Sequence, residues 1–247
     1  MASPLISVMI PTYNRAKYIR QAIDSVIAQD YRPLEIIVVD DGSTDETSEL
    51  VRQYDSFTVK YFYKENIKMN VASARNMCLS KASGSFLAWL DSDDYYLPGK
   101  LSAQMEYLNE HSECEIVFTQ VEDFFENEND KEIMNQAIYS KVLFGETKVC
   151  HATMLARRGM IQRTGSINED LKIFEDMEWL YRIYFKYNVD ISHCLENVYV
   201  MRRMHPDGMA YTRRTPENLA AVLKITDQYM REKIRRDLLN ARKKQSQ

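Results

Sequence analysis

Four short segments rich in apolar residues mark the first part of the chain. They span residues 5–10, 34–39, 59–63 and 86–90, and such runs are typical of strands buried within a sheet. The segments between them show helical spacing, clearest at residues 19–27 and 70–81. Strand and helix thus alternate four times in about 95 residues, which predicts βαβ units. We expect an α/β fold with a Rossmann-like, mainly parallel sheet covered by helices on both faces.

Polar residues after the first two strands can act as helix caps. Asn14 precedes the apolar positions of the first helix, and Ser43 or Thr44 precedes the second. Side chains of these types often accept a hydrogen bond from the first turn of a helix. We therefore expect helices to begin shortly after these residues.

The second half of the chain lacks this regular alternation. Residues 100–111 read as a helix and 115–121 as a strand, whereas 122–132 is acidic and predicts a solvated loop. Residues 139–212 mix short elements. From Pro216 onward one long helix is expected, with an apolar face formed by Leu219, Val222, Leu223, Thr226, Met230, Ile234 and Leu238.

The composition indicates a soluble protein in a reducing environment. No run reaches the roughly 18 apolar residues that a membrane span needs, and no signal peptide is visible. The four cysteines are widely spaced, which favours unpaired thiols in the cytoplasm. The net charge of −4 hides a basic segment, 213–247, with ten Lys or Arg against four Asp or Glu. An acidic body argues against nucleic acid, and the basic tail favours an anionic surface or an acidic partner.

Three carboxylates follow the fourth predicted strand, in Asp91-Ser92-Asp93-Asp94. Ligands of open α/β sheets bind at the carboxyl ends of strands. Carboxylates this close repel one another unless a cation lies between them. Mg²⁺ or Mn²⁺ with a nucleotide diphosphate would supply that charge. The alternative is a solvated turn that caps the helix after Pro98.

Two other strand ends offer groups that could hold a nucleotide. The sequence has neither GxGxxG nor a P-loop. Instead, Tyr13 follows the first strand and could stack on a base. Asp40 and Asp41 follow the second, and a carboxylate can accept a hydrogen bond from uracil N3–H. Taken separately, Tyr13 could equally be a packed rim residue and the two aspartates a capping turn.

Together these segments resemble family 2 of the GT-A glycosyltransferases. The resemblance rests on ISVMIPTYNR at 6–15, EIIVVDDGSTD at 35–45, ARN at 74–76 and LDSDD at 90–94, in matching order and spacing. It implies an inverting sugar transfer from a nucleotide sugar, usually a UDP-sugar, with Mn²⁺ or Mg²⁺. It also implies a catalytic domain over 1–212, with nucleotide-binding (1–100) and acceptor-binding (101–212) halves, followed by a basic helical tail (213–247).

The resemblance assigns roles to matching positions in the first half. Tyr13 would stack on the base and Asp41 would accept from its N3–H. Asp93 would bind the metal ion. Pro11 and Thr12 would contact the nucleoside, and Arg75 would lie near the diphosphate. Asp91 would hold the ribose or a metal-bound water. Asn70 and Cys78 stand where the family commonly has glycine, and Asn70 can tolerate a left-handed backbone.

The resemblance extends more weakly to the second half. Glu175-Asp176 is similar to a family signature whose Asp is the general base, so Asp176 would take the proton from the acceptor hydroxyl. Arg203 would neutralise the leaving group, and His205 would be a metal ligand or a phosphate donor. His151 is a candidate for the acceptor cleft. For each, a capping, surface or structural role remains the alternative.

Several functional alternatives remain open. A nucleotidyltransferase shares the nucleotide half but usually has a Gly-rich basic loop where this chain has PTYN at 11–14. A UDP-sugar-binding module without catalysis would bind UDP but release none. A processive synthase is disfavoured by the absence of a membrane span and of Gln-x-x-Arg-Trp. We expect a glycan or lipid-linked acceptor at the inner face of the membrane. The tail helix either packs on the body or docks peripherally on an anionic membrane.

Overall fold

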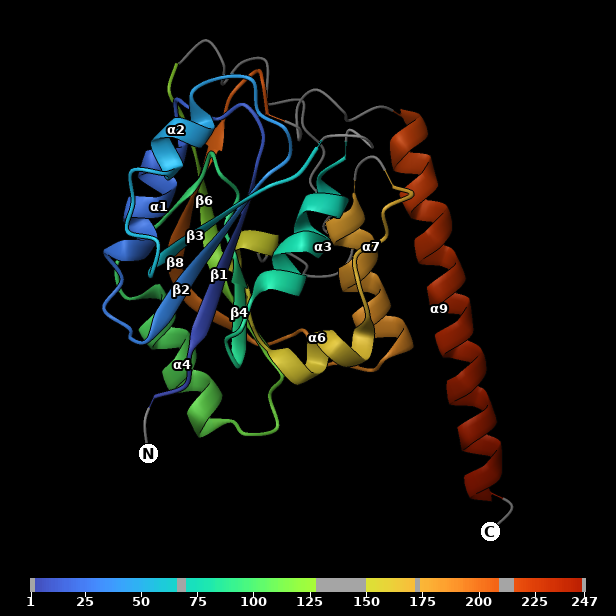
Figure 1. Ribbon diagram of the computed structural model, residues 1–247. Coiled ribbons are helices and arrows are strands. Elements are labelled where there is room, and N and C mark those ends of the chain that lie inside the picture. Colours follow the sequence, from blue (N-terminus) through green and yellow to red (C-terminus); the bar gives the residue numbers. More distant parts are fainter. Residues whose placement is uncertain (1–2, 66–69, 128–149, 172–173, 209–215, 246–247) are drawn as a thin grey trace.

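The computed structural model describes residues 3–65, 70–127, 150–171, 174–208 and 216–245, and Figure 1 shows their arrangement. The first four strands form the parallel sheet that the sequence predicts. Its order is β3 (Val59–Tyr63), β2 (Leu34–Asp40), β1 (Ile6–Thr12) and β4 (Phe86–Trp89). All four strands therefore end at the same edge of the sheet.

The sheet becomes mixed beyond β4. It continues through β7 (Leu155–Arg157), β6 (Ile116–Phe125), β8 (Cys194–Met204) and β5 (Tyr95–Tyr96). Pairing of β7 is antiparallel to both neighbours, β6 and β8 are parallel, and β5 is antiparallel to β8. The expected α/β fold is confirmed, with a sheet that is parallel through its first four strands and mixed beyond them. The predicted acidic loop at 122–132 is partly wrong, because β6 continues to Phe125; residues 128–132 lie outside the described part.

Helices cover both faces of this sheet, as predicted. One hydrophobic cluster joins the strands to α1 (Ile19–Ile27) and α4 (Lys100–Glu110), with α2 (Thr47–Val51) beside them. The other joins the strands to α3 (Val71–Lys81), α6 (Arg158–Thr164) and α7 (Glu175–Tyr181). Alternate residues of β1 enter opposite clusters, Ile10 the first and Met9 the second. Burial on both faces explains why these strands read as continuous apolar runs.

The turns differ from the predicted caps. Asn14 adopts a left-handed backbone, with φ 49°, and its side chain accepts a hydrogen bond from the Thr44 backbone at 2.8 Å. Helix α1 begins later, at Ile19, and has no side-chain cap. Helix α2 likewise begins at Thr47 without one. Asn70, by contrast, is extended and caps α3 by accepting from Ser73 N, so it does not use the left-handed geometry suggested for it.

Lys100, the first residue of α4, is fully buried. Its ammonium donates to Gln104 Oε1 at 2.9 Å and lies 4.2 Å from the centre of the Tyr96 ring. Among the described residues, no carboxylate pairs with it. Burial accordingly lowers the pKa of Lys100 to about 7.

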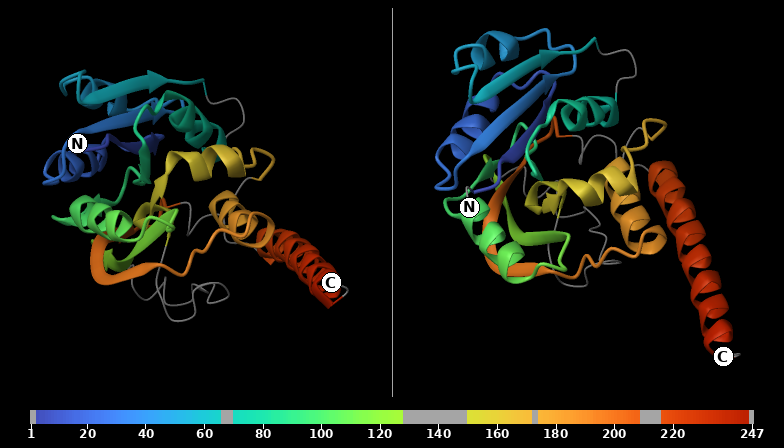
Figure 2. Two further views of the ribbon diagram at one scale, coloured as in Figure 1. Left: turned by 90° about the horizontal axis from the view of Figure 1, so that it is seen from below. Right: turned by 60° about the horizontal axis from the view of Figure 1, so that its bottom comes forward.

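Helix α9 (Pro216–Gln245) is the predicted long C-terminal helix. It contacts α7 and the π-helical turn η2 (Arg182–Lys186), and it runs beside the body and on past it in Figure 1 and in both views of Figure 2. Within the described ranges, no helix is both long and apolar enough to cross a membrane. Cys78, Cys114, Cys150 and Cys194 form no disulfide, as expected.

Candidate active site

The candidate site lies where β1, β2 and β4 end. The C-terminal end of β8 and the start of α7 lie beside it. The turn after β4 carries Asp91, Asp93 and Asp94. Each carboxylate has a different partner within the protein. The chain's own groups supply part of the compensating charge, yet burial and the charge of Asp93 still raise the pKa values of Asp91 and Asp94. The three carboxylates therefore have separate partners but still repel one another, and the expected external cation stays a prediction.

Asp93 is held between the side chains of Arg15 and His205. Its Oδ2 accepts a hydrogen bond from Arg15 Nε at 3.0 Å, and His205 Nε2 lies 3.2 Å from the same oxygen. Burial opposes ionisation of Asp93, but the hydrogen bond from His205 and the charge of Arg15 lower its pKa overall. Arg15 also donates to the carbonyls of Asn14 and Asp207. Asp93 is thus an anion fixed between the first strand end and the turn after β8.

Asp91 belongs to a second network, centred on Arg75. Arg75 is 4% exposed and donates to Asp91 Oδ1 at 2.9 Å and to Glu175 Oε1. Burial raises the pKa of Asp91; among nearby charges Arg75 lowers it, whereas Asp93 and Asp176 raise it. Glu175 is buried too, and its burial raises its pKa to about 7. Arg75 therefore ties the turn after β4 to the start of α7.

Asp176 is placed by this same connection. The residue before α7, Phe174, has a left-handed backbone with φ 62°. The helix then begins with Glu175, which turns inward to Arg75, while Asp176 is partly exposed. The Oδ1 of Asp176 accepts from Met177 N at 2.8 Å. Two adjacent carboxylates thus have different surroundings: one is buried and paired with a cation, and the other can reach solvent.

Asp94 and Arg203 connect β8 to the turn. Asp94 accepts from the backbone N–H of Arg203 at 2.8 Å, and its burial raises its pKa well above the usual range. The Arg203 guanidinium donates to the Asp93 carbonyl at 2.9 Å and also to Glu126 and Gln21. All three of its nitrogens are engaged, so in this structure Arg203 fixes the turn. A direct role for Arg203 on the diphosphate stays a prediction.

The candidate base pocket lies at the ends of β1 and β2. Tyr13 is 43% exposed, whereas Thr12 and Asp41 are buried. The Asp41 backbone donates to Thr12 O at 2.8 Å, and its carboxylate accepts from Lys64 at 2.7 Å. Burial raises the pKa of Asp41 although Lys64 lowers it. The backbone contact between Thr12 and Asp41 places the ends of β1 and β2 side by side, and the roles of Tyr13 and Asp41 at a base stay predictions.

Pro11 lies in β1 beyond the part that pairs with β4. Their pairing ends at Met9 and Trp89, with Leu90 N donating to Met9 O. A proline is tolerated here because β4 needs no further donor from β1. Pro11 therefore ends the two-sided ladder just before the residues of the candidate pocket.

His151 does not line an open cleft. It is 1% exposed and lies between the rings of Trp89 and Trp179, at centroid distances of 5.0 and 5.4 Å. Burial lowers its pKa well below the usual range. The suggestion of an acceptor contact is therefore wrong, and His151 is a neutral core residue.

The residues near Asp93 fit a divalent cation with few protein ligands. Asp93 Oδ2 and His205 Nε2 lie 3.2 Å apart, close to the spacing of about 3 Å between neighbouring ligands of an octahedral ion. His205 Nδ1 is buried and finds no hydrogen-bond partner in the described part. No cluster of three or more His, Cys, Asp or Glu side chains forms a metal cage within the described ranges. Mg²⁺ commonly binds in this way, through one or two protein groups plus phosphates and water.

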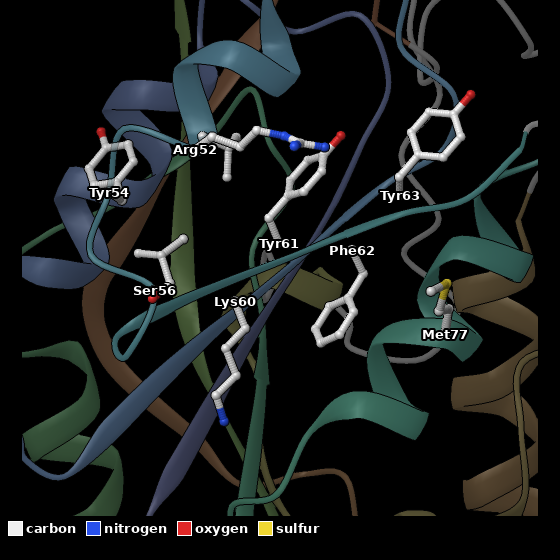
Figure 3. Close-up of a pocket in the computed structure, with 10 residues that line it drawn as sticks. Arg52, Tyr54, Ser56, Lys60, Tyr61, Phe62, Tyr63 and Met77 are labelled. Atoms are coloured by element: carbon white, nitrogen blue, oxygen red, sulfur yellow. The ribbon is translucent and has the colours of Figure 1, made fainter.

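A separate groove of about 590 Å³ runs along the edge strand β3 (Figure 3). It is lined by Arg52, Lys60, Tyr61, Tyr63 and Met77, among others. None of its lining residues is a predicted site residue. Lys60 pairs with Glu35, and Tyr61 donates to Asp40. These contacts brace the outer strand, so the groove is no part of the candidate site.

Arg15, Lys64 and Glu175 contact the candidate site residues, and sequence reasoning gave them no role. Arg15 binds Asp93 across 78 positions and Lys64 binds Asp41 across 23. The available signal was charge balance: a motif rich in carboxylates needs nearby cations. Arg15 and Lys64 each follow a predicted strand that ends at the site.

Comparison with known proteins identifies the family. The profile described as glycosyl transferase family 2 matches residues 7–165, more than half of the chain. The chain belongs to glycosyl transferase family 2. The match contains the Tyr13, Asp41, Arg75 and Asp91–Asp94 segments, and Asp176 and His205 lie beyond it.

Individual relatives of this family 2 chain agree. It is 43% identical over 109 residues to the GalNAc(5)-diNAcBac-PP-undecaprenol beta-1,3-glucosyltransferase of Campylobacter jejuni, covering 43% of this chain and 35% of the relative. It is similar in structure to S. aureus TarS 1-349 in complex with UDP-GlcNAc, with TM-score 0.74, 22% identity, and 91% and 66% of the two chains covered. It is also similar to the mannosyltransferase PcManGT of Pyrobaculum calidifontis in complex with GDP-Man and Mn²⁺. That match has a TM-score of 0.64 and 18% identity, and it covers 94% of this chain and 74% of PcManGT.

These likenesses differ in what they establish. At 18% and 22% identity the structural matches show the GT-A fold alone. The chain spans between 15% and 65% of the length of the first curated relatives it matches. Family and fold are therefore shown, together with the class of enzyme to which the relatives belong.

Proposed function

We propose that this family 2 chain transfers a sugar, with inversion, from a nucleotide-diphospho-sugar to a hydroxyl of a glycan or lipid-linked acceptor. The observation that carries the proposal is the Arg75 bridge. It joins Asp91, beside Asp93, to Glu175, beside Asp176, and Arg75 itself lies 100 positions from Glu175 in the chain. Groups suited to a leaving diphosphate and to proton removal thus belong to one site.

We take the donor to be a UDP-sugar. Tyr13 would stack on the uracil while Asp41 accepts its N3–H, with Pro11 and Thr12 beside the nucleoside. The complex of TarS with UDP-GlcNAc supports this choice through the shared fold. In this division the first half of the chain binds the nucleotide and residues 101–212 bind the acceptor.

The chemistry we assign is a single displacement. Asp176 accepts the proton of the acceptor hydroxyl as its oxygen forms a bond to the anomeric carbon. The bond from that carbon to the diphosphate breaks on the opposite side, and UDP leaves. Arg75 holds Asp91 and the start of α7 in register during this step. A divalent ion bound by Asp93 and His205, Mn²⁺ or Mg²⁺, would offset the charge of the leaving diphosphate.

We place the reaction in the cytoplasm, at the inner face of the membrane, on a glycan or undecaprenol-type lipid-linked acceptor. The name of the Campylobacter relative, which includes an undecaprenol-linked saccharide, supports this acceptor class. Peripheral contact with an anionic membrane would bring enzyme and acceptor together.

Incubation of the purified chain with a panel of UDP-sugars tests the proposal. We expect UDP release from at least one donor with Mn²⁺ or Mg²⁺, none in excess EDTA, and none from Asp93→Ala. Binding of UDP without release from any donor, with or without candidate acceptors, would instead indicate a module without catalysis. Release of pyrophosphate from UTP and a sugar phosphate would indicate a nucleotidyltransferase.

A further inference from the structure

Helix α9 exposes a row of large apolar side chains. Leu223, Met230, Ile234 and Leu238 are 51%, 39%, 56% and 60% exposed. Intervals of seven, four and four residues place them on one side of the helix. Elsewhere in the described chain, only Tyr13, Phe57 and Tyr63 are large, apolar and comparably exposed. The apolar row is therefore a concentrated feature of α9.

The apolar row is not the face that packs on the protein. Thr226 is buried, and Tyr229 donates to Glu178 of α7 at 2.7 Å. Arg236 donates to the carbonyls of Phe185 and Lys186 at 2.7 Å. These contacts lie on an adjacent side of the helix and are largely polar. Helix α9 is thus anchored to the body while its apolar row remains exposed.

A basic row adjoins the apolar row on its other side. Lys224, Arg231 and Arg235 are all exposed, and each directly follows an apolar-row residue, about 100° further round the helix. Asp227 lies between the two rows and pairs with Arg231 at 2.8 Å. Lys224 and Arg235 form no ion pair with a described residue. This outward side of α9 is therefore both apolar and net positive, whereas the rest of the chain holds the excess of acidic residues.

We propose that the apolar and basic rows of α9 form a docking surface for an anionic lipid bilayer. A helix of this kind lies in the plane of the interface, with its apolar side chains among the acyl chains and its cations among the headgroups. A second copy of the chain fits less well, because an isologous contact would bring two net positive patches together. The proposal rests on the proposed function, since a lipid-linked acceptor would bring this surface to the membrane.

Cosedimentation with vesicles tests the docking directly, without any donor sugar. The full chain should bind vesicles of phosphatidylglycerol and phosphatidylcholine at low salt, and binding should weaken as salt rises. Replacing Lys224 and Arg235 by Gln should weaken binding about 25-fold, since each cation near an anionic surface contributes about five-fold. The triple variant Leu223→Ser, Ile234→Ser, Leu238→Ser should abolish it. Phe57→Ser, at an exposed residue far from α9 in sequence, is the matched control and should bind as the wild type does.

Two further readouts separate the possible outcomes. UDP release from a UDP-sugar in solution should be unchanged in the triple variant, so failed docking and failed catalysis remain distinguishable. Sedimentation velocity should show the same mass for wild type and triple variant. Wild-type protein that ignores these vesicles at low salt overturns the proposal. So does a concentration-dependent dimer that the triple variant dissolves without any loss of vesicle binding.

Discussion

Replacing Asp41 by Asn should change which base the protein prefers. Asp41 is 6% exposed, and its backbone contact to Thr12 holds it next to Tyr13. Its carboxylate accepts from Lys64 and, in our proposal, also from uracil N3–H. Asn has nearly the same shape, but when its amide oxygen faces Lys64 its NH₂ group faces the base. A donor then meets the N3–H donor of uracil, whereas the N3 of cytosine is an acceptor.

The expected loss follows from that single contact. A hydrogen bond to a charged group contributes about 1.5–3 kcal/mol, which corresponds to a Kd for UDP about 10- to 150-fold weaker. Pyrophosphate with Mn²⁺ does not contact Asp41, so its Kd should not change. The affinity of the variant for CDP should fall less than its affinity for UDP, or should rise. Burial raises the pKa of Asp41. As the pH is lowered, the wild-type affinity for UDP should therefore begin to fall at a higher pH than it would with an ordinary Asp.

Isothermal titration calorimetry of the three ligands provides the assay. Lys64→Met is the matched control, because it removes the neighbouring cation but leaves the carboxylate. That control should retain the preference for UDP over CDP. Equal losses for UDP and pyrophosphate in Asp41→Asn would refute the assignment of Asp41 to the base, as would an unchanged ratio of UDP to CDP affinity.

Three further predictions concern charges around the site and in the core. Arg15→Ala should bind Mn²⁺ several-fold more tightly without nucleotide, because a cation beside Asp93 is removed; weaker binding by electron paramagnetic resonance would contradict this. Burial lowers the pKa of Lys100 from 10.5 to about 7. Between pH 7 and pH 10.5 the Lys100 amine is therefore protonated in the unfolded chain but not in the folded protein. Stability should therefore rise with pH in this window, and urea unfolding should show the rise missing in Lys100→Met; equal slopes would count against it. Burial alone would raise the pKa of Glu35, but hydrogen bonds from Lys60, Ser7 and Ser83 lower it to about 2, so Glu35→Gln should be destabilised by about 2–3 kcal/mol at pH 7. The deficit should disappear as pH falls from 4.5 through 2, and a deficit that persists there in urea unfolding would exclude the charge as its cause.

The first half of the fold was readable from sequence because its strands are buried on both faces. Their apolar runs and the helical spacing between them depend on local pattern alone. The second half was harder to predict because its strands are stabilised by distant partners. Asp123, read as part of a loop, pairs in β6 with Arg202 of β8, 79 positions away. No local pattern reveals such a pair.

The candidate site shows the same division. Residue types at strand ends suggested Tyr13, Asp41 and Asp93, and the fold brings the strand ends that carry them to one edge. Their electrostatic partners could not be read, since Arg15 lies 78 positions from Asp93. The contacts of Arg203 with the Asp93 carbonyl, Glu126 and Gln21 could not be read from sequence either, and its assignment to the diphosphate stays a prediction. Charge type is visible in sequence, whereas the pairing of charges requires the fold.

The most direct test of the central claim compares wild type with Asp176→Asn on the same preparations. Asp176 is partly exposed at the start of α7, and its side chain accepts a local hydrogen bond from Met177 N, so the variant should fold and bind UDP as the wild type does. Our account predicts that sugar transfer falls by about 10²- to 10⁴-fold, the usual effect of losing a general base. Transfer that falls less than ten-fold, with UDP binding intact, would contradict it.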